Sequence, residues 1–124
     1  MRKIFIAIIA LAAMVAFNSC DQEKTTAQKL VKEFLEENLE SEDFKIMDYS
    51  RLDSTKLISD SVFLRLRADG SKSKVFKADI HYADGPKTEK LNYLRVKYRV
   101  DKDTVNQTFY LDDQLTRIVA FKTD

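Results

Sequence analysis

The residues of this chain that can bind a partner by charge are basic and aromatic side chains in its second half. They are Arg65, Arg67, Lys77, His81, Tyr93, Arg95, Lys97 and Arg99. Alternate residues of an extended chain point to the same side, so neighbouring strands can gather such side chains into one patch. Guanidinium and ammonium groups bind carboxylates and phosphates. The pattern therefore predicts a candidate binding face for a small anionic ligand or for an acidic protein surface.

The same residues also fit a solvated sheet face. Asp79 and Glu89 are close in sequence and can balance part of the positive charge. Charged side chains on an exposed face also keep sheets from pairing edge to edge. The residue pattern leaves both interpretations open.

Catalytic chemistry has little support in the residue types. His81 is the only histidine and Cys20 the only cysteine, and no G-x-S-x-G stretch occurs. Nucleophilic catalysis needs a base oriented beside a nucleophile, and zinc sites usually draw on several His and Cys ligands. Asp112 and Asp113 occupy a turn, a context that is not expected to raise a carboxyl pKa. We predict no catalytic residue, no metal site and no cofactor.

The N-terminus combines two positive charges with a short apolar segment. Arg2 and Lys3 precede residues 4–17, which carry no polar side chain. This arrangement is typical of a secretory signal peptide, and the apolar run is shorter than the roughly 20 residues that span a bilayer. An ordinary cleavage site requires small residues, and Phe17 occupies one of those positions.

Ser19-Cys20 resembles the end of a bacterial lipobox, in the looser form that is common in Bacteroidota-like bacteria, with Phe17 in place of the usual Leu. The resemblance covers residues 1–20. It implies that residues 1–19 are a lipoprotein signal peptide and that Cys20 carries diacylglycerol and an acyl chain such as palmitate. The implied location is the cell envelope, anchored by lipid, with the outer membrane favoured.

A physical reason favours lipidation of Cys20. A single cysteine cannot form an internal disulfide, and acylation removes an exposed exported thiol. Two acyl chains hold a protein at a membrane where one does not. The alternative is an unmodified thiol after an ordinary signal peptide or membrane anchor.

The mature chain must form elements that position these residues. Residues 20–24 are short and polar and are predicted to be an extended tether. Residues 25–40 place apolar side chains at spacings of three and four, which predicts an amphipathic helix, with Thr25 and Gln28 as a capping box. Strands are predicted near 44–51, 61–68, 74–82, 90–101, 104–111 and 115–122, where Val, Ile, Phe, Tyr and Thr are frequent.

Short polar turns join these strands, which favours antiparallel pairing, and no second helix is predicted. The predicted fold class is α+β: residues 25–124 form a single domain with one N-terminal amphipathic helix on a curled antiparallel sheet of about 4–6 strands. This arrangement resembles the cystatin-like and nuclear-transport-factor-like folds. Fold alone does not imply function.

The expected function is that of a lipid-anchored, non-enzymatic binding or accessory protein of the envelope. Without Arg2 and Lys3, the 21 basic side chains fall to 19 against 20 acidic ones, so no basic excess points to a nucleic-acid partner. An alternative is an inhibitor or immunity protein against an exported protease or lysozyme. A third is a small enzyme with a pocket on the sheet face.

Overall fold

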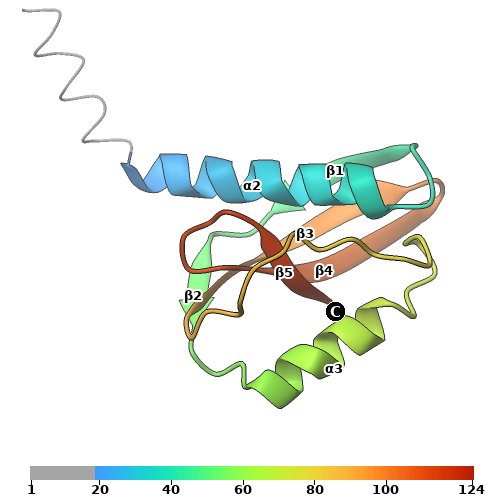
Figure 1. Cartoon of the computed structure of the whole chain (residues 1–124). Helices are drawn as coiled ribbons and strands as arrows, with labels where there is room; N and C mark the ends of the chain where they lie inside the picture. The colour runs from blue at the N-terminus through green and yellow to red at the C-terminus, as the bar shows by residue number, and fades with distance from the viewer. Residues whose placement is uncertain (1–18) are drawn as a thin grey trace, which may run out of the picture.

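An antiparallel sheet of five strands forms the centre of the protein (Figure 1). The computed structural model describes residues 19–124. The strands are β1 (Phe44–Tyr49), β2 (Asp53–Thr55), β3 (Leu91–Val100), β4 (Asp103–Leu111) and β5 (Ile118–Thr123). The order is β1-β3-β4-β5, with β2 also paired to β3, and the sheet does not close into a barrel. These features confirm the predicted α+β class and strand number.

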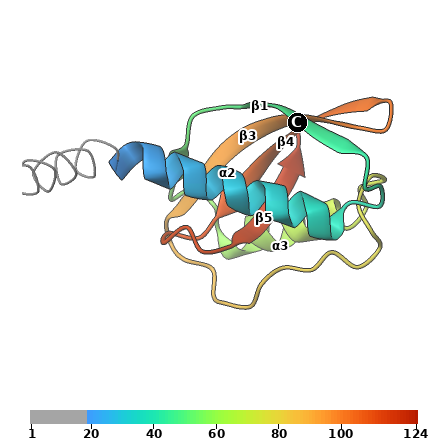
Figure 2. The ribbon, with the colours of Figure 1, turned by 90° about the horizontal axis from the view of Figure 1, so that it is seen from above.

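Helix α2 (Ser19–Asn38) covers one face of this sheet, as Figure 2 shows from above. Its buried residues recur at helical spacing: Ala27, Val31, Phe34, Leu35 and Asn38. They pack against alternate residues of β3 and β4, among them Leu94, Val96 and Phe109. The apolar residues that recur every 3.6 residues in the helix and every second residue in the strands therefore form one core, as the sequence pattern predicts.

The helix begins earlier than predicted, because residues 20–24 are helical and not an extended tether. Thr25 lies inside the helix and its hydroxyl donates to the carbonyl of Asp21 at 2.8 Å, so the predicted capping box is wrong. Residues 21–26 are exposed and burial starts at Ala27. Asp21 lies in the first turn, where its negative charge interacts favourably with the positive end of the helix dipole.

Residues 61–68 form a helix, which corrects the predicted strand. Helix α3 (Asp60–Gly70) begins after Ser59, whose hydroxyl accepts a hydrogen bond from the amide of Val62 at 3.3 Å. Phe63 and Leu66 pack toward the sheet, while Leu64 is 65% exposed. The apolar residues thus follow helical spacing, and α3 lies on the face of the sheet opposite α2 (Figure 2).

The predicted strand at 74–82 is also wrong, because this segment joins no strand of the sheet. It contains one isolated bridge, between Leu39 and Phe76. Near the end of the segment, the backbone of His81 bonds to the buried Asn38 side chain. This side chain accepts from the His81 amide at 2.7 Å and donates to the His81 carbonyl at 3.3 Å. The Asn38 amide therefore satisfies the two backbone groups that a neighbouring strand would otherwise bind.

Within residues 19–124, the structure has no helix that is long and apolar enough to cross a membrane. The predicted signal peptide, residues 1–19, lies outside the described residues apart from Ser19. Cys20 is the second residue of α2. Its side chain is outside the described part, so its lipidation stays a prediction.

Candidate functional site

The face of the sheet opposite α2 is divided into a covered part and an open part. Near β5 it is covered by α3, whose Phe63 and Leu66 contact Tyr110 and Val119. The rest is exposed apart from the buried Thr108, and the strand register assigns its residues. We call this surface the open face; it consists of Lys45, Asp48, Arg95, Lys97, Arg99, Thr104, Asn106, Thr108, Lys122 and Asp124.

Three cations of β3 form the centre of the open face. Arg95, Lys97 and Arg99 are exposed and alternate with the buried Val96 and Tyr98. Cross-strand partners lie on the same side of a sheet, so Lys45 stands beside Arg99. Likewise Thr108 lies between Arg95 and Lys122.

The open face is therefore basic on a domain that is close to neutral. Its five cations, Lys45, Arg95, Lys97, Arg99 and Lys122, exceed its two carboxylates, Asp48 and Asp124. In the part of the chain that the structure describes, none of the five cations forms an ion pair. These charges remain accessible to an anionic partner.

A shallow groove of about 480 Å³ runs through the open face. Its walls are Asp48, Ser50, Arg95, Val96, Lys97, Asn106 and Asp124. The Asp124 carboxylate is fixed by Thr108, whose hydroxyl donates to it at 3.0 Å. The groove thus offers two cations for binding and two carboxylates that limit which anions fit.

A tyrosine pair marks the boundary between the open face and α3. Tyr93 and Tyr110 have ring centroids 6.1 Å apart and face each other across β3 and β4. Burial, and then the nearby Asp124 carboxylate, raise the pKa of Tyr110, while Arg95 acts in the opposite direction. Tyr93 remains half-buried and can contact a partner seated on the open face.

Arg67 belonged to the predicted patch, but it has a structural role. Its Nε donates to the carbonyl of Val119 at 2.9 Å. Its guanidinium lies over two rings, 4.6 Å from the centroid of Phe63 and 4.3 Å from that of Tyr82. Burial lowers the pKa of Arg67. The residue fastens α3 to the edge strand β5 and is not part of the open face.

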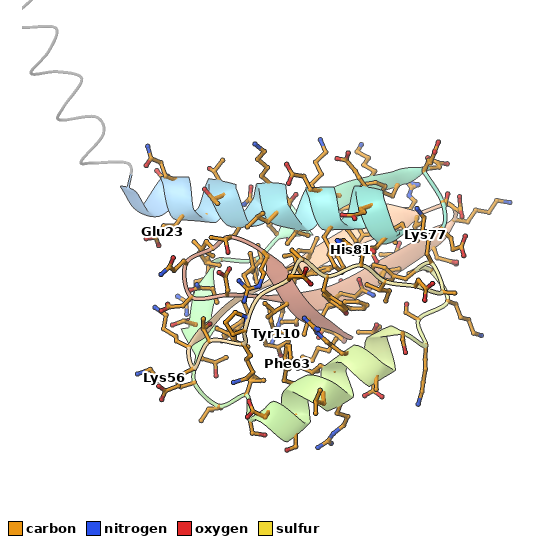
Figure 3. The ribbon with its side chains drawn as sticks, viewed as in Figure 1. Glu23, Lys56, Phe63, Lys77, His81 and Tyr110 are labelled. Atoms are coloured by element: carbon orange, nitrogen blue, oxygen red, sulfur yellow. The ribbon has the colours of Figure 1, made fainter. Side chains whose placement is uncertain are left out.

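The other three predicted residues do not lie on the strands that form the open face. The Lys77 Nζ donates to the carbonyl of Glu37 at 3.0 Å, and the His81 Nε2 lies 3.9 Å from the Glu37 carboxylate. Figure 3 shows Lys77 and His81 by the C-terminal end of α2, whereas Phe63 and Tyr110 lie between the sheet and α3. Arg65 is exposed on α3. The predicted eight-residue patch is therefore wrong as a single surface.

Several residues of the open face were not predicted. Lys45 and Asp48 come from β1, Lys122 from β5, and Asp124 from the last position of the chain. Their strands were largely predicted, but the faces depend on register, and β1 has a register shift between Ile46 and Asp48. The sequence contained one usable signal for the open face: polar residues alternate along β4 at Thr104, Asn106 and Thr108.

Residues 19–124 contain no group of three or more His, Cys, Asp or Glu side chains that can hold a metal ion. Asp112 lies in the predicted turn, between β4 and β5, and its side chain is buried. Burial acts to raise its pKa, but hydrogen bonds from Thr116 and Arg117 outweigh this and the pKa of Asp112 lies below its ordinary value. Asp112 therefore stays ionised at neutral pH.

Comparisons with models of known protein families, with curated proteins and with solved structures gave no match. The exposed cations, hydroxyls and one half-buried tyrosine of the open face are suited to noncovalent binding of an anionic surface.

Proposed function

We propose that this protein is a lipid-anchored, non-enzymatic binding protein of the bacterial cell envelope, and that its open face binds an anionic partner. The observation that carries the proposal is the row Arg95, Lys97 and Arg99, exposed and without an ion-pair partner among the described residues. Unpaired charges of one sign on one surface attract a partner of the opposite sign and orient it.

The spacing of the cations describes the partner further. Alternate residues of a strand are roughly 7 Å apart, so the row extends over about 13 Å. A single small carboxylate engages one or two of these groups, whereas an acidic protein surface or a polymer with repeated anionic groups engages all three. We therefore favour a multivalent carboxylate or phosphate partner, held mainly by charge.

A charge-reversal variant tests the open face. Arg95→Glu with Arg99→Glu is expected to weaken binding to immobilised poly-L-glutamate or polyphosphate about tenfold or more at low salt, because each exposed contact contributes up to about 1 kcal/mol. The matched control, Lys29→Glu with Arg65→Glu, makes the same change of net charge at exposed positions on α2 and α3. Equal weakening in both variants would mean that only net charge matters and would reject the site.

The inhibitor or immunity alternative has one observation in its favour. The turn between β3 and β4, with the exposed residues 101–103, protrudes from the rest of the molecule (Figure 2). A protruding turn can enter the cleft of an enzyme. The open-face variant leaves this turn intact, so an envelope partner that the variant still captures would favour the inhibitor function.

The membrane attachment has its own test. Cys20 lies seven residues before Ala27, the first buried residue of α2. At 1.5 Å per helical residue this holds the domain within about 10 Å of the lipid. Cys20→Ser is expected to remove the acyl mass and to leave the precursor uncut, as measured by intact mass of membrane-extracted protein. Normal processing of this variant would reject the lipoprotein assignment.

A further inference from the structure

The two edge strands of the sheet, β5 and β1, differ in their contacts. At one edge, Arg67 of α3 donates a hydrogen bond to the Val119 carbonyl of β5. At the other, β1 pairs only with β3 within residues 19–124. An uncovered edge presents backbone donors and acceptors to another strand. Met47, in the middle of β1, is 50% exposed although it is apolar.

The sequence of β1 is complementary to itself when it is read in the opposite direction. The strand reads Phe44-Lys45-Ile46-Met47-Asp48-Tyr49. If a second copy runs antiparallel with its centre between Ile46 and Met47, each pair of opposed residues is favourable. An aromatic residue faces an aromatic residue, Lys45 faces Asp48, and Ile46 faces Met47. Opposed pairs of these kinds stabilise antiparallel strands.

The register shift in β1 makes this pairing sterically consistent. Phe44 and Tyr49 are five residues apart, so a regular strand would place them on opposite faces. The shift between Ile46 and Asp48 moves Tyr49 opposite Val96, while Phe44 lies opposite Val100. Both of these β3 residues are buried on the α2 side.

Lys45 and Asp48 likewise share the open face, since they lie opposite Arg99 and Lys97. Phe44 and Lys45 therefore meet their complements, Tyr49 and Asp48, on the same face of a joined sheet. The self-complementary order and the register shift are two separate features of the chain that agree on one arrangement.

We propose that the occupant of this edge is a second copy of the chain, paired through β1 about a two-fold axis perpendicular to the sheet. The two sheets then form one continuous sheet, and each favourable pair occurs twice, as expected of an isologous interface. The axis keeps both α2 helices on one side and both open faces on the other.

A groove beside β1 supports the same occupant. It has a volume of about 730 Å³ and is lined by Lys32, Glu36, Glu42, Phe44, Lys45, Ile46 and Tyr49. The two-fold axis brings the grooves of both copies together. Lys32 and Glu36 are one turn apart on α2, and the axis makes the two helices antiparallel, so each copy offers one basic and one acidic side chain to the other across the joined groove. The charges that line the groove are thus complementary to their own rotated copy.

The test uses the full chain with two different C-terminal tags in co-expressing cells. Lys45→Asp and Asp48→Lys each place like charges opposite each other twice in a homodimer. In the mixed dimer, both pairs are again opposite in charge. We expect wild-type copies to co-purify from detergent extracts, each variant with itself to fall at least fivefold, and the mixture of variants to recover the wild-type level. Thermal unfolding of each variant checks that the fold persists.

Chemical crosslinking places the contact at the strand. Met47→Cys lies next to the axis and is expected to give dimers in membranes treated with a short bis-maleimide. Leu64→Cys, which is 65% exposed on α3, and the unmodified chain are the controls. Wild-type copies that do not co-purify, or a variant mixture no better than either variant alone, would overturn the proposal. Capture of a different protein by β1 without self-association would also overturn it.

Discussion

Replacing Phe34 with alanine is expected to lower the free energy of unfolding by about 3–5 kcal/mol, the usual cost of deleting a buried ring. Phe34 is 6% exposed. Its ring centroid lies 5.5 Å from that of Tyr82, 6.0 Å from Phe121, and 6.1 Å from both Phe76 and Phe109. One side chain of α2 therefore joins the helix to β4, β5 and the long segment that follows α3.

Chemical denaturation of the wild type and the variant measures this loss. Leu64→Ala is the matched control, because it deletes a large apolar side chain that is 65% exposed and should change stability by less than about 0.5 kcal/mol. Hydrogen exchange in Phe34→Ala should accelerate most in residues 74–82, which depend on Phe34 for packing. A loss below about 1 kcal/mol would mean that α2 is not docked on the sheet as described.

The misassigned helix shows where hydrophobic periodicity becomes ambiguous. In residues 61–68 the apolar side chains satisfy a period of two as well as helical spacing, so pattern alone does not separate strand from helix. The deciding signals were local. Ser59 provides an N-cap and Asp60 an acidic first turn, both of which favour a helix start.

Residues 74–82 show a different limit. The alternation was informative in part. Phe76, Ile80 and Tyr82 pack toward the core, but Val75, which alternation places on the other side, packs there as well. The pattern could not identify the hydrogen-bond partner of the His81 backbone. That partner is the side chain of Asn38 in the last turn of α2, which is 43 residues away in sequence. A polar residue on the buried face of a predicted helix is the signal that could have suggested such a role.

The candidate site was predictable only along one strand. Tyr93, Arg95, Lys97 and Arg99 alternate within β3, and the structure keeps them on one face. Combining them with Arg67 required a neighbouring strand that does not exist. Adding Lys45 and Lys122 required the register of β1 and β5, which depends on a bulge and on long-range pairing.

A buried ion pair links the β4–β5 turn to the long segment before β3. The Asp112 carboxylate accepts from the amide and hydroxyl of Thr116 at 2.7 and 2.5 Å. It also accepts from the amide of Arg117 at 3.1 Å and from its Nη1 at 3.4 Å. Arg117 in turn donates from Nη2 to the carbonyl of Pro86. Gly85, at φ 149°, leaves room for the guanidinium, because a Cβ there would lie 2.5 Å from Arg117 Cζ.

Asp112→Ala is expected to destabilise the domain by about 3–5 kcal/mol, because it leaves the buried Arg117 without its counter-ion and removes the acceptor for four hydrogen bonds. The exposed neighbour Asp113 provides the control, since its carboxylate pairs with Lys90 at 3.2 Å near the surface. Asp113→Ala should change stability by about 1 kcal/mol or less. Denaturant unfolding at neutral pH compares the two.

The pH dependence of stability tests whether the charge of Asp112 is what stabilises this turn. Because the folded pKa of Asp112 lies below its ordinary value of 3.8, the carboxylate stabilises the fold fully above that value. The contribution is lost as the pH falls through the lower folded pKa. Asp112→Asn keeps the shape and cannot ionise, so its stability deficit relative to wild type should shrink as the pH falls below 3.8. A deficit that stays constant over this range would show that shape or donor geometry, and not the buried charge, holds this turn to Pro86.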